Sequence, residues 1–268
     1  MIRIIATDID RTLATGGKIP ASAVAAAKEA LAAGIKVVLA SGRPLVGMQE
    51  YLDTLGIAGS EQYVITHNGG ILADTEGRVL SSHLMSNADY VSLTEFGRQH
   101  HVPFGVQDAS GQVYTADHDI DYITALQAVE NHCSIRVRRP DAMPVDFAIA
   151  KADFVGDPAL LDKVEPFVRA KYGDELYITR AGRVFIELMN KDVSKGRALA
   201  ELVRRLGYSA DEVMAIGDEE NDLPLLKFAG TAVAMGNGLD TVKAAADHVT
   251  DDIAHDGWAH AVRKYALS

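Results

Sequence analysis

Two carboxylates stand two residues apart near the start of the chain, in Asp8-Ile9-Asp10, directly after an isoleucine-rich apolar run. At the end of a buried strand, two such groups repel each other unless a cation lies between them. A carboxylate can also act as a covalent nucleophile that accepts a phosphoryl group. Because short D-x-D patterns also occur at solvated strand ends, this pair alone leaves both interpretations open.

A second acidic cluster, Gly217-Asp218-Glu219-Glu220-Asn221-Asp222, follows a later apolar run. Four carboxylates in five positions favour a divalent cation, and Mg²⁺ prefers oxygen ligands. Asp218 comes directly after the predicted strand and is expected to be a direct ligand, whereas Asp222 suits a supporting position one helical turn further on. The alternative is an acidic helix start stabilised by the helix dipole, which is our interpretation of Glu219 and Glu220.

Two further segments carry groups that suit a phosphate. Ser41-Gly42-Arg43 follows another apolar run and offers a hydroxyl, backbone amides and a guanidinium. Lys195 begins a predicted helix, where a positive charge is unfavourable with the helix dipole, and neutralising a phosphate and a carboxylate would explain it. Taken alone, the first segment is equally well a turn into a helix, and for Lys195 alone a solvent-exposed side chain is the favoured interpretation.

The elements that carry these groups alternate between apolar strands and helices. Predicted strands cover 2–7, 35–40, 63–66, 213–217 and 231–234, and predicted helices cover 20–33, 44–55, 194–206 and 223–228. This pattern is typical of an α/β fold with a doubly wound parallel sheet, whose ligands gather at the carboxyl ends of the strands. The candidate residues are therefore expected at one edge of one sheet.

In the middle of the chain, predicted strands and helices follow one another in a different order, which predicts an inserted α+β module with an antiparallel sheet. Its predicted helices cover 90–100 and 119–131, a third helix follows the capping residue Asp157, and its strands cover 147–155, 176–179 and 184–189, with a hairpin over 104–115. We therefore expect a catalytic core at 1–83 and 190–268 and an inserted cap at 84–189. Within the insertion, Lys151 and Glu187 are flanked by apolar residues, and we interpret them as the solvent-facing side of their strands; the alternative is that they face the substrate.

Charge and composition exclude several classes of protein. The formal net charge of −11 argues against a nucleic-acid partner, although a pocket can be locally positive on an acidic surface. No apolar run approaches the roughly 20 residues that span a bilayer, and no signal peptide is recognisable. The single cysteine, Cys133, excludes an internal disulfide framework and a cysteine-built metal site. We expect a cytoplasmic protein without a membrane partner.

Taken in the order in which they occur along the chain, the motifs resemble those of the haloacid dehalogenase superfamily of phosphatases. Asp8-x-Asp10-x-Thr12-Leu13 is similar to its first motif, Ser41 to its second, Lys195 to its third, and Gly217-Asp218-x-x-Asn221-Asp222 to its fourth. Through the segments 40–44, 65–69 and 216–222, the chain also resembles the Cof-type hydrolases. These are sugar-phosphate phosphatases with an inserted α/β cap of the C2 type.

The resemblance implies a Mg²⁺-dependent phosphatase of small phosphorylated metabolites. Asp8 would attack phosphorus, and Asp10 would act as general acid and then as general base. The implied metal site consists of Asp8, the Asp10 backbone carbonyl and Asp218, with Asp222 behind them. The implied phosphate and substrate contacts come from Ser41, Gly42, Arg43, Asn68, Gly69, Lys195 and Asn221.

Arg11 departs from the family pattern, which usually has glycine after the second aspartate. A positive φ at this position would strain an arginine by about 1 kcal/mol; otherwise the side chain would reach the pocket mouth and favour anionic substrates. A phosphosugar-binding protein without turnover and a phosphomutase remain open alternatives. A glycosyltransferase would not need Lys195 or the second acidic cluster, and a signalling receiver domain would be far shorter.

Overall fold

The computed structural model describes all 268 residues, which form two compact units. The first unit comprises Met1–Gly42, Met48–Ser81 and Ser194–Ser268, and the second comprises Arg43–Gly47 and Ser82–Val193. Each unit has a hydrophobic core of its own. No helix combines the length and the apolar character that a membrane span requires.

The first unit is built on an eight-stranded sheet with the order β16-β15-β14-β1-β2-β3-β4-β5. The strands are β1 (Ile4–Thr7), β2 (Lys36–Ala40), β3 (Tyr63–Thr66), β4 (Ile71–Asp74), β5 (Val79–Ser82), β14 (Val213–Gly217), β15 (Thr231–Ala234) and β16 (His248–Val249). From β16 to β3 all neighbours are parallel, which confirms the predicted α/β class. The pair β3–β4 is antiparallel because the short connection between them cannot hold a crossover helix.

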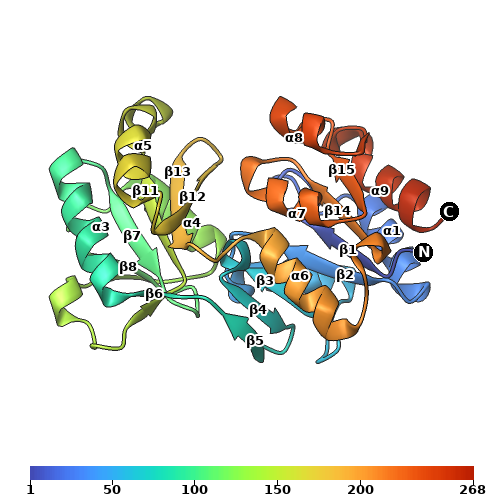
Figure 1. Ribbon diagram of the computed structural model, residues 1–268, viewed down its shortest axis with the longest axis horizontal. Helices are drawn as coiled ribbons and strands as arrows, with labels where there is room; N and C mark the ends of the chain where they lie inside the picture. Colours follow the sequence, from blue (N-terminus) through green and yellow to red (C-terminus); the bar gives the residue numbers. More distant parts are fainter. The chain divides into compact units, whose positions relative to one another are not determined.

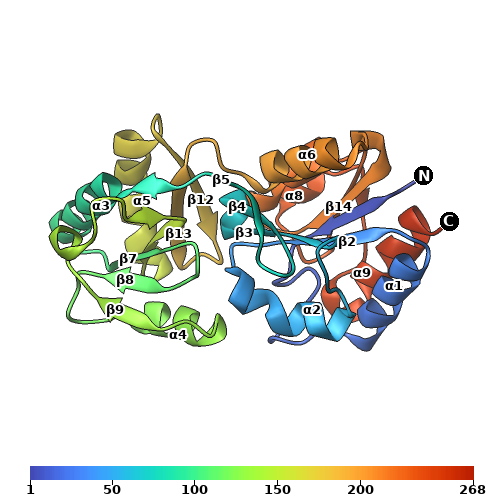
Figure 2. The ribbon, with the colours of Figure 1, turned by 90° about the horizontal axis from the view of Figure 1, so that it is seen from below.

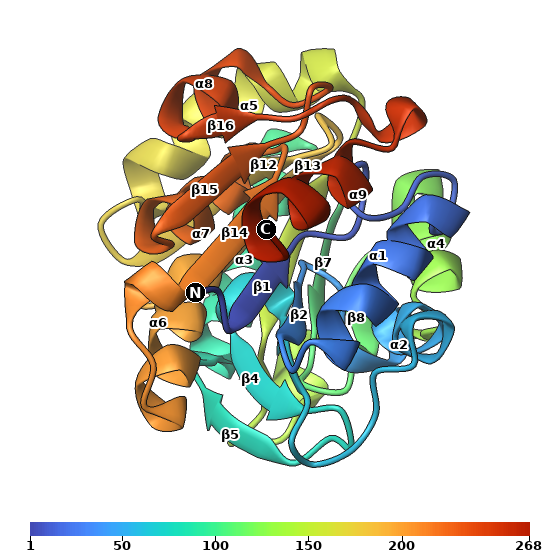
Figure 3. The same cartoon turned by 90° about the vertical axis from the view of Figure 1, so that its right-hand side faces the viewer.

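Helices cover both faces of this sheet, as Figures 2 and 3 show. One face carries α1 (Ala21–Ala32), α2 (Gln49–Leu55) and α9 (Gly257–Ala261), and the other carries α6 (Lys195–Leu206), α7 (Leu223–Phe228) and α8 (Asp240–Ala245). The predicted helix over 44–55 is a 3-10 turn, η1 (Leu45–Met48), followed by the short α2. Both faces of the strands are buried, which explains why the strands read as continuous apolar runs.

The second unit contains a six-stranded sheet with the order β12-β13-β11-β7-β8-β9. The strands are β7 (Phe104–Gln107), β8 (Val113–Thr115), β9 (Ile135–Val137), β11 (Lys151–Val155), β12 (Leu176–Ala181) and β13 (Phe185–Asn190). Its pairs are antiparallel as predicted, except that β8 and β9 are parallel. The predicted strand over 147–155 is broken at Ala150 into β10 (Ala148–Ile149), which pairs with β6 (Met85–Ser86), and β11.

Three helices complete the second unit: α3 (Asn87–His100), α4 (Tyr122–Glu130) and α5 (Pro158–Tyr172), which can be followed in Figure 1. Apolar residues of α3 and α5 share one core cluster with Ala152 and Phe154 of β11. Because side chains alternate along a strand, Lys151 and Asp153 of β11 point to the opposite face of the sheet. That face is polar.

Candidate active site

Three neighbouring strands bring the first candidate residues to one edge of the sheet. Asp8 follows β1, Ser41 follows β2 and Asp218 follows β14, and the strand order β14-β1-β2 places these ends side by side. The amide of Asp8 continues the ladder by donating to the Ile216 carbonyl at 3.1 Å. The strands therefore fix the nucleophile candidate and the second acidic cluster beside each other, as expected for a parallel sheet.

Lys195 connects the two acidic segments. Its Nζ donates to Asp8 Oδ1 at 2.6 Å and to Asp222 Oδ1 at 2.7 Å, and its side chain is fully buried. Ser194 caps α6 by accepting from the Arg197 amide, so Lys195 occupies the first helical turn. Burial alone would lower the pKa of Lys195, but the carboxylates of Asp222 and Asp8 outweigh burial and raise it. Lys195 is therefore a fixed positive charge.

Asp8, Asp218 and Asp222 form a buried carboxylate cluster whose oxygens lie within 4.8 Å of one another. Burial raises the pKa of Asp8 well above its usual range, and burial together with Asp222 raises the pKa of Asp218 to about 7. Asp218 Oδ2 is buried and accepts no hydrogen bond from the chain. A divalent cation would supply the missing partner, and an all-oxygen ligand set suits Mg²⁺. The residues present therefore fit such an ion.

Asp222 and Thr12 hold this cluster in place. Asp222 Oδ2 accepts from the amides of Asp218 at 2.9 Å and Glu219 at 3.1 Å, so both oxygens of Asp222 have partners within the chain. The Thr12 hydroxyl donates to Asp218 Oδ1 at 2.7 Å. A Cβ on Gly217 would lie 2.5 Å from the Asp222 side chain, so only glycine allows this packing. Asp222 therefore links Lys195 to the backbone that follows β14.

Asp10 lies outside the carboxylate cluster. Its side chain is exposed, whereas Ile9 before it is fully buried. The turn that follows is closed by the Arg11 amide, which donates to the Ala14 carbonyl at 2.7 Å. The chain therefore presents Asp10 outward at the same strand end, where a ligand can reach it.

A short network joins Asn68, Asn221 and Ser41. Asn221 Nδ2 donates to Asn68 Oδ1 at 3.0 Å, and the Asn68 amide donates to the Ser41 carbonyl at 2.9 Å. The 3-10 turn η2 (His67–Gly69) carries Asn68 at a φ of +56°. A Cβ on Gly69 would lie 2.3 Å from the Ser194 carbonyl oxygen, so glycine lets this turn pack against the start of α6. Three predicted site residues therefore organise the surroundings of Lys195 through their backbone and amide groups.

Arg43 and Gly42 lie where the chain passes between the units. Gly42 ends a segment of the first unit and is half-buried. Arg43 belongs to the second unit, where its Nη1 donates to the Glu130 carbonyl and to Asn131 Oδ1, each at 3.2 Å. The structure therefore gives Arg43 partners at the end of α4, and a phosphate contact for either residue stays a prediction.

Sequence reasoning assigned no chemical role to Thr12, Glu219 and Trp258. Thr12 bonds directly to Asp218, and Glu219 forms an ion pair with Arg11 at 2.5 Å. The Trp258 indole donates to Thr7 Oγ1 at 2.9 Å, and that hydroxyl donates to the Asp8 carbonyl at 2.8 Å. The position of Thr12 within the first motif, two residues after Asp10, could have indicated a contact with the acidic residues of the site. Nothing in the local sequence linked Trp258 to Thr7.

The second unit holds a polar cluster on the sheet face opposite α3 and α5. Lys151 Nζ lies 2.5 Å from Glu187 Oε1 and 3.4 Å from Asp153 Oδ1, and Gln127 Nε2 donates to Asp153 Oδ2 at 3.2 Å. All are buried, so the interpretation of Lys151 and Glu187 as solvent-facing is wrong. Burial raises the pKa of Asp153 to about 6, despite the opposing charge of Lys151. The nearby Gln107 Oε1 accepts no hydrogen bond.

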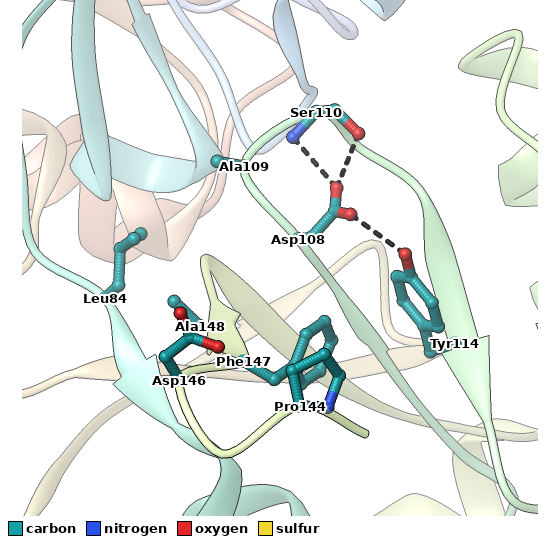
Figure 4. Close-up of a pocket in the computed structure, with 9 residues that line it drawn as sticks. All are labelled: Leu84, Asp108, Ala109, Ser110, Tyr114, Pro144, Asp146, Phe147 and Ala148. Atoms are coloured by element: carbon teal, nitrogen blue, oxygen red, sulfur yellow. Dashed lines mark hydrogen bonds between the residues drawn. The ribbon is translucent and has the colours of Figure 1, made fainter. Parts of the chain in front are cut away.

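A separate cavity of about 440 Å³ lies within the second unit, and Figure 4 shows its walls. Leu84, Pro144 and Phe147 supply apolar surface, and Asp108 and Asp146 supply carboxylates. Asp108 Oδ1 accepts hydrogen bonds from the Ser110 amide at 2.9 Å and from the Ser110 hydroxyl at 2.6 Å. With two carboxylates and no basic side chain in its walls, this cavity does not suit a phosphate.

Comparisons with known proteins agree with this geometry. A sequence model of the haloacid dehalogenase-like hydrolases matches residues 5–262. A Streptococcus pyogenes protein named "Putative phosphatase M6_Spy0533" is 34% identical over all of this chain and 99% of its own length. The Bacillus subtilis protein named "Putative phosphatase YxeH" is 32% identical over the full length of both chains.

A solved structure of a haloacid dehalogenase-like hydrolase from Bacteroides thetaiotaomicron superposes with a TM-score of 0.85. That protein is 29% identical, and the match covers 98% of this chain and 99% of the other. The α/β fold and the matches to hydrolases over the whole chain define the class of protein. The chain belongs to the haloacid dehalogenase-like hydrolase family, and it is an enzyme, a phosphoric monoester hydrolase.

Proposed function

We propose that this phosphatase depends on Mg²⁺ and hydrolyses small phosphorylated metabolites, sugar phosphates in particular, through an aspartyl-phosphate on Asp8. The observation that carries the proposal is the position of Asp8: its Oδ1 accepts from Lys195 at 2.6 Å beside the buried carboxylates of Asp218 and Asp222. We also propose that the enzyme works in the cytoplasm, in keeping with its single cysteine, which is free.

In the first step, a carboxylate oxygen of Asp8 forms a bond to phosphorus while the bond from phosphorus to the ester oxygen breaks. Asp10 donates its proton to the departing alcohol, since its side chain is exposed at the same strand end. In the second step, Asp10 takes a proton from water as the water oxygen attacks phosphorus. The phosphorus–Asp8 bond breaks, which releases inorganic phosphate and restores the Asp8 carboxylate.

Positive charge at the transferring group carries most of the stabilisation in phosphoryl transfer. Lys195 supplies one fixed charge at the nucleophile and orients Asp8 for attack. A bound Mg²⁺ would add charge at the phosphoryl oxygens, held by the side chains of Asp8 and Asp218 and the backbone carbonyl of Asp10. Asp222 supports Lys195 and Asp218 without binding the ion.

The remaining site residues are proposed to bind the phosphoryl group or the substrate. Ser41 follows β2, which lies next to β1, the strand that precedes Asp8. Its hydroxyl would donate a hydrogen bond to an oxygen of the phosphoryl group. Asn68 and Asn221 join the turn that follows β3 to the turn that follows β14 through their mutual hydrogen bond. The other proposed contacts, Gly42, Arg43 and Gly69, are offered on the basis of the motifs.

The second unit is proposed to be the cap that selects the substrate. Its polar cluster supports this role, because Gln107 Oε1 and Thr179 Oγ1 are buried without a hydrogen-bond partner. Lys151 and Glu187 add a donor and an acceptor on the same sheet face. Such groups suit an uncharged leaving group rich in hydroxyls, since each hydroxyl both donates and accepts.

The experiment that tests the function is hydrolysis of p-nitrophenyl phosphate in the presence of Mg²⁺. Activity is expected to disappear in Asp8→Asn and on chelation of Mg²⁺, and rapid quenching should trap a phosphorylated Asp8 peptide detectable by mass spectrometry. Asp240→Asn, which changes a fully exposed carboxylate of the same unit, is the control and should leave the rate unchanged. Turnover that survives in Asp8→Asn would reject the mechanism.

A further inference from the structure

Arg11 occupies a backbone conformation that its side chain makes costly. Its φ is +64°, in the left-handed region where glycine is unstrained. The conformation is held by two hydrogen bonds: the Arg11 amide donates to the Ala14 carbonyl at 2.7 Å, and Asn237 Nδ2 donates to the Arg11 carbonyl at 2.9 Å. A glycine would serve the same turn without strain, so the strain at Arg11 directs attention to what its side chain contacts.

The guanidinium of Arg11 reaches the carboxylate cluster from the solvent side. Nη1 lies 2.5 Å from Glu219 Oε1, and Nη2 donates to the Asn237 carbonyl at 3.2 Å. Nε lies 3.7 Å from Asp218 Oδ2, the buried oxygen that accepts no hydrogen bond. The side chain of Arg11 is 52% exposed, whereas that of Asp218 is fully buried. Arg11 thus places a positive charge beside the ligand oxygen that we assign to the metal.

The ion pairs of the site distinguish Arg11 from Lys195 as the cation beside Asp218 Oδ2. Lys195 forms its ion pairs with Asp8 and Asp222, and Arg11 forms one with Asp218. Arg11 is the cation nearest to Asp218 among the ion pairs of the site. A divalent ion at Asp218 Oδ2 would meet a guanidinium already paired with that oxygen, and like charges at this distance repel each other.

We propose that Arg11 weakens the affinity of this site for its divalent cation, because its guanidinium lies 3.7 Å from the Asp218 oxygen that would bind the ion. The inference rests on the proposed Mg²⁺ dependence and goes beyond it, because it assigns a role to a residue that the general mechanism does not use. The ion and the guanidinium compete for one carboxylate, while Glu219 and Asn237 keep the guanidinium close by. Arg11 is a positioning residue and does not touch the reacting atoms.

The test is calorimetric titration of the full-length protein with Mg²⁺, together with the rise in unfolding midpoint that Mg²⁺ produces. Arg11→Gln keeps the strained backbone position and removes the charge, Arg11→Gly removes both strain and charge, and Arg11→Lys keeps a charge. We expect Arg11→Gln and Arg11→Gly to bind Mg²⁺ about tenfold more tightly than the unaltered protein, with correspondingly larger midpoint shifts. Arg11→Lys should stay closer to the unaltered protein.

Arg78→Gln is the matched control. Arg78 is an exposed arginine whose Nε lies 3.0 Å from Oδ2 of a buried aspartate, Asp74, and neither residue belongs to the carboxylate cluster. It should leave the Mg²⁺ affinity unchanged. An unaltered affinity in Arg11→Gln would overturn the inference, as would a gain confined to Arg11→Gly, which would assign the effect to strain. If the unaltered protein itself shows no Mg²⁺ binding, the proposed function fails instead, so the two failures are distinguishable.

Discussion

The ammonium group of Lys195 lies between Asp8 and Asp222, at 2.6 Å from one carboxylate oxygen and 2.7 Å from the other. Asp8 follows β1, Asp222 ends the turn η5 (Glu220–Asp222) after β14, and Lys195 begins α6. One buried side chain therefore fixes three segments that are far apart in the sequence. Lys195 binds Oδ1 of Asp8, and Oδ2 of Asp8 takes no part in this ion pair.

Replacing Lys195 with methionine should damage stability and catalysis together. The substitution keeps the length of the side chain but leaves Asp8 and Asp222 buried without their shared partner, which typically costs about 3 kcal/mol or more. We expect kcat/KM for p-nitrophenyl phosphate to fall at least ~100-fold, since a charge at the transferring group is lost. Chemical unfolding and steady-state kinetics measure the two effects.

A double variant separates these effects. In Lys195→Met/Asp222→Asn, one uncompensated carboxylate is gone, so part of the lost stability should return while the activity stays low. Recovery of activity without the lysine would contradict the role given to its charge. Equal stability of the single variant and the unaltered protein would contradict the ion pairs themselves.

Thr12→Val should weaken the binding of Mg²⁺. The substitution is close in shape but removes the hydroxyl that donates to Asp218 Oδ1 at 2.7 Å in a fully buried position. Groups that orient a metal ligand in this way typically account for about 10- to 100-fold in metal affinity. Calorimetric titration with Mg²⁺ checks the loss, and Thr12→Ser, which keeps the hydroxyl, should retain most of the affinity. A valine variant with undiminished affinity would show that Asp218 needs no orienting hydrogen bond.

Much of the fold could be predicted because its buried parallel strands are continuous apolar runs. The bounds predicted for β3, β14, β15 and α7 agree with the structure. The strands β9 and β16 were not predicted, since each has only two or three residues and β16 is half exposed. The parallel pairing of β8 with β9 also escaped prediction, because nothing local specifies a pairing partner that lies far along the chain.

The candidate site could be predicted as a set of positions but not as a set of contacts. Strand-end carboxylates and a lysine at a helix start point to chemistry because packing alone does not explain them. The pairing of Arg11 with Glu219 and the chain of hydrogen bonds from Trp258 through Thr7 depend on segments more than 200 residues apart. Sequence patterns are local, so such pairs emerge only from the folded chain.

Glu187→Gln should change the selectivity of the enzyme. The substitution removes the charge that pairs with Lys151 at 2.5 Å in the polar cluster of the second unit. If this cluster contacts the leaving group, kcat/KM for a hexose 6-phosphate should fall about tenfold more than kcat/KM for p-nitrophenyl phosphate, whose leaving group lacks the sugar hydroxyls. Parallel kinetics with the two substrates give the ratio directly.

Glu165→Gln is the matched control for this selectivity, because Glu165 pairs with Arg180 at 2.7 Å in the same unit, and α5 carries it on the other side of the sheet. It should lower neither rate. Equal losses on both substrates in Glu187→Gln would indicate a structural cluster without a part in selecting the substrate.

Asp153 should make the stability of the protein depend on pH. Burial raises its pKa from the ordinary 3.8 to about 6, with Lys151 opposing and Glu187 adding to the rise. A carboxyl with a higher pKa in the folded protein than in the unfolded chain holds its proton more tightly when folded. Its contribution to stability is therefore largest below about pH 4, falls as the pH rises towards about 6, and is lost above that value.

Asp153→Asn should remove this dependence, because the amide does not titrate. Between about pH 4 and 7 the unfolding free energy of the unaltered protein should fall by about 2 kcal/mol more than that of the variant. Chemical unfolding at a series of pH values measures the difference, and Asp162→Asn, at an exposed carboxylate of the same unit, should follow the unaltered protein. Parallel pH profiles for Asp153→Asn and the unaltered protein would mean that Asp153 remains ionised beside Lys151 throughout this range.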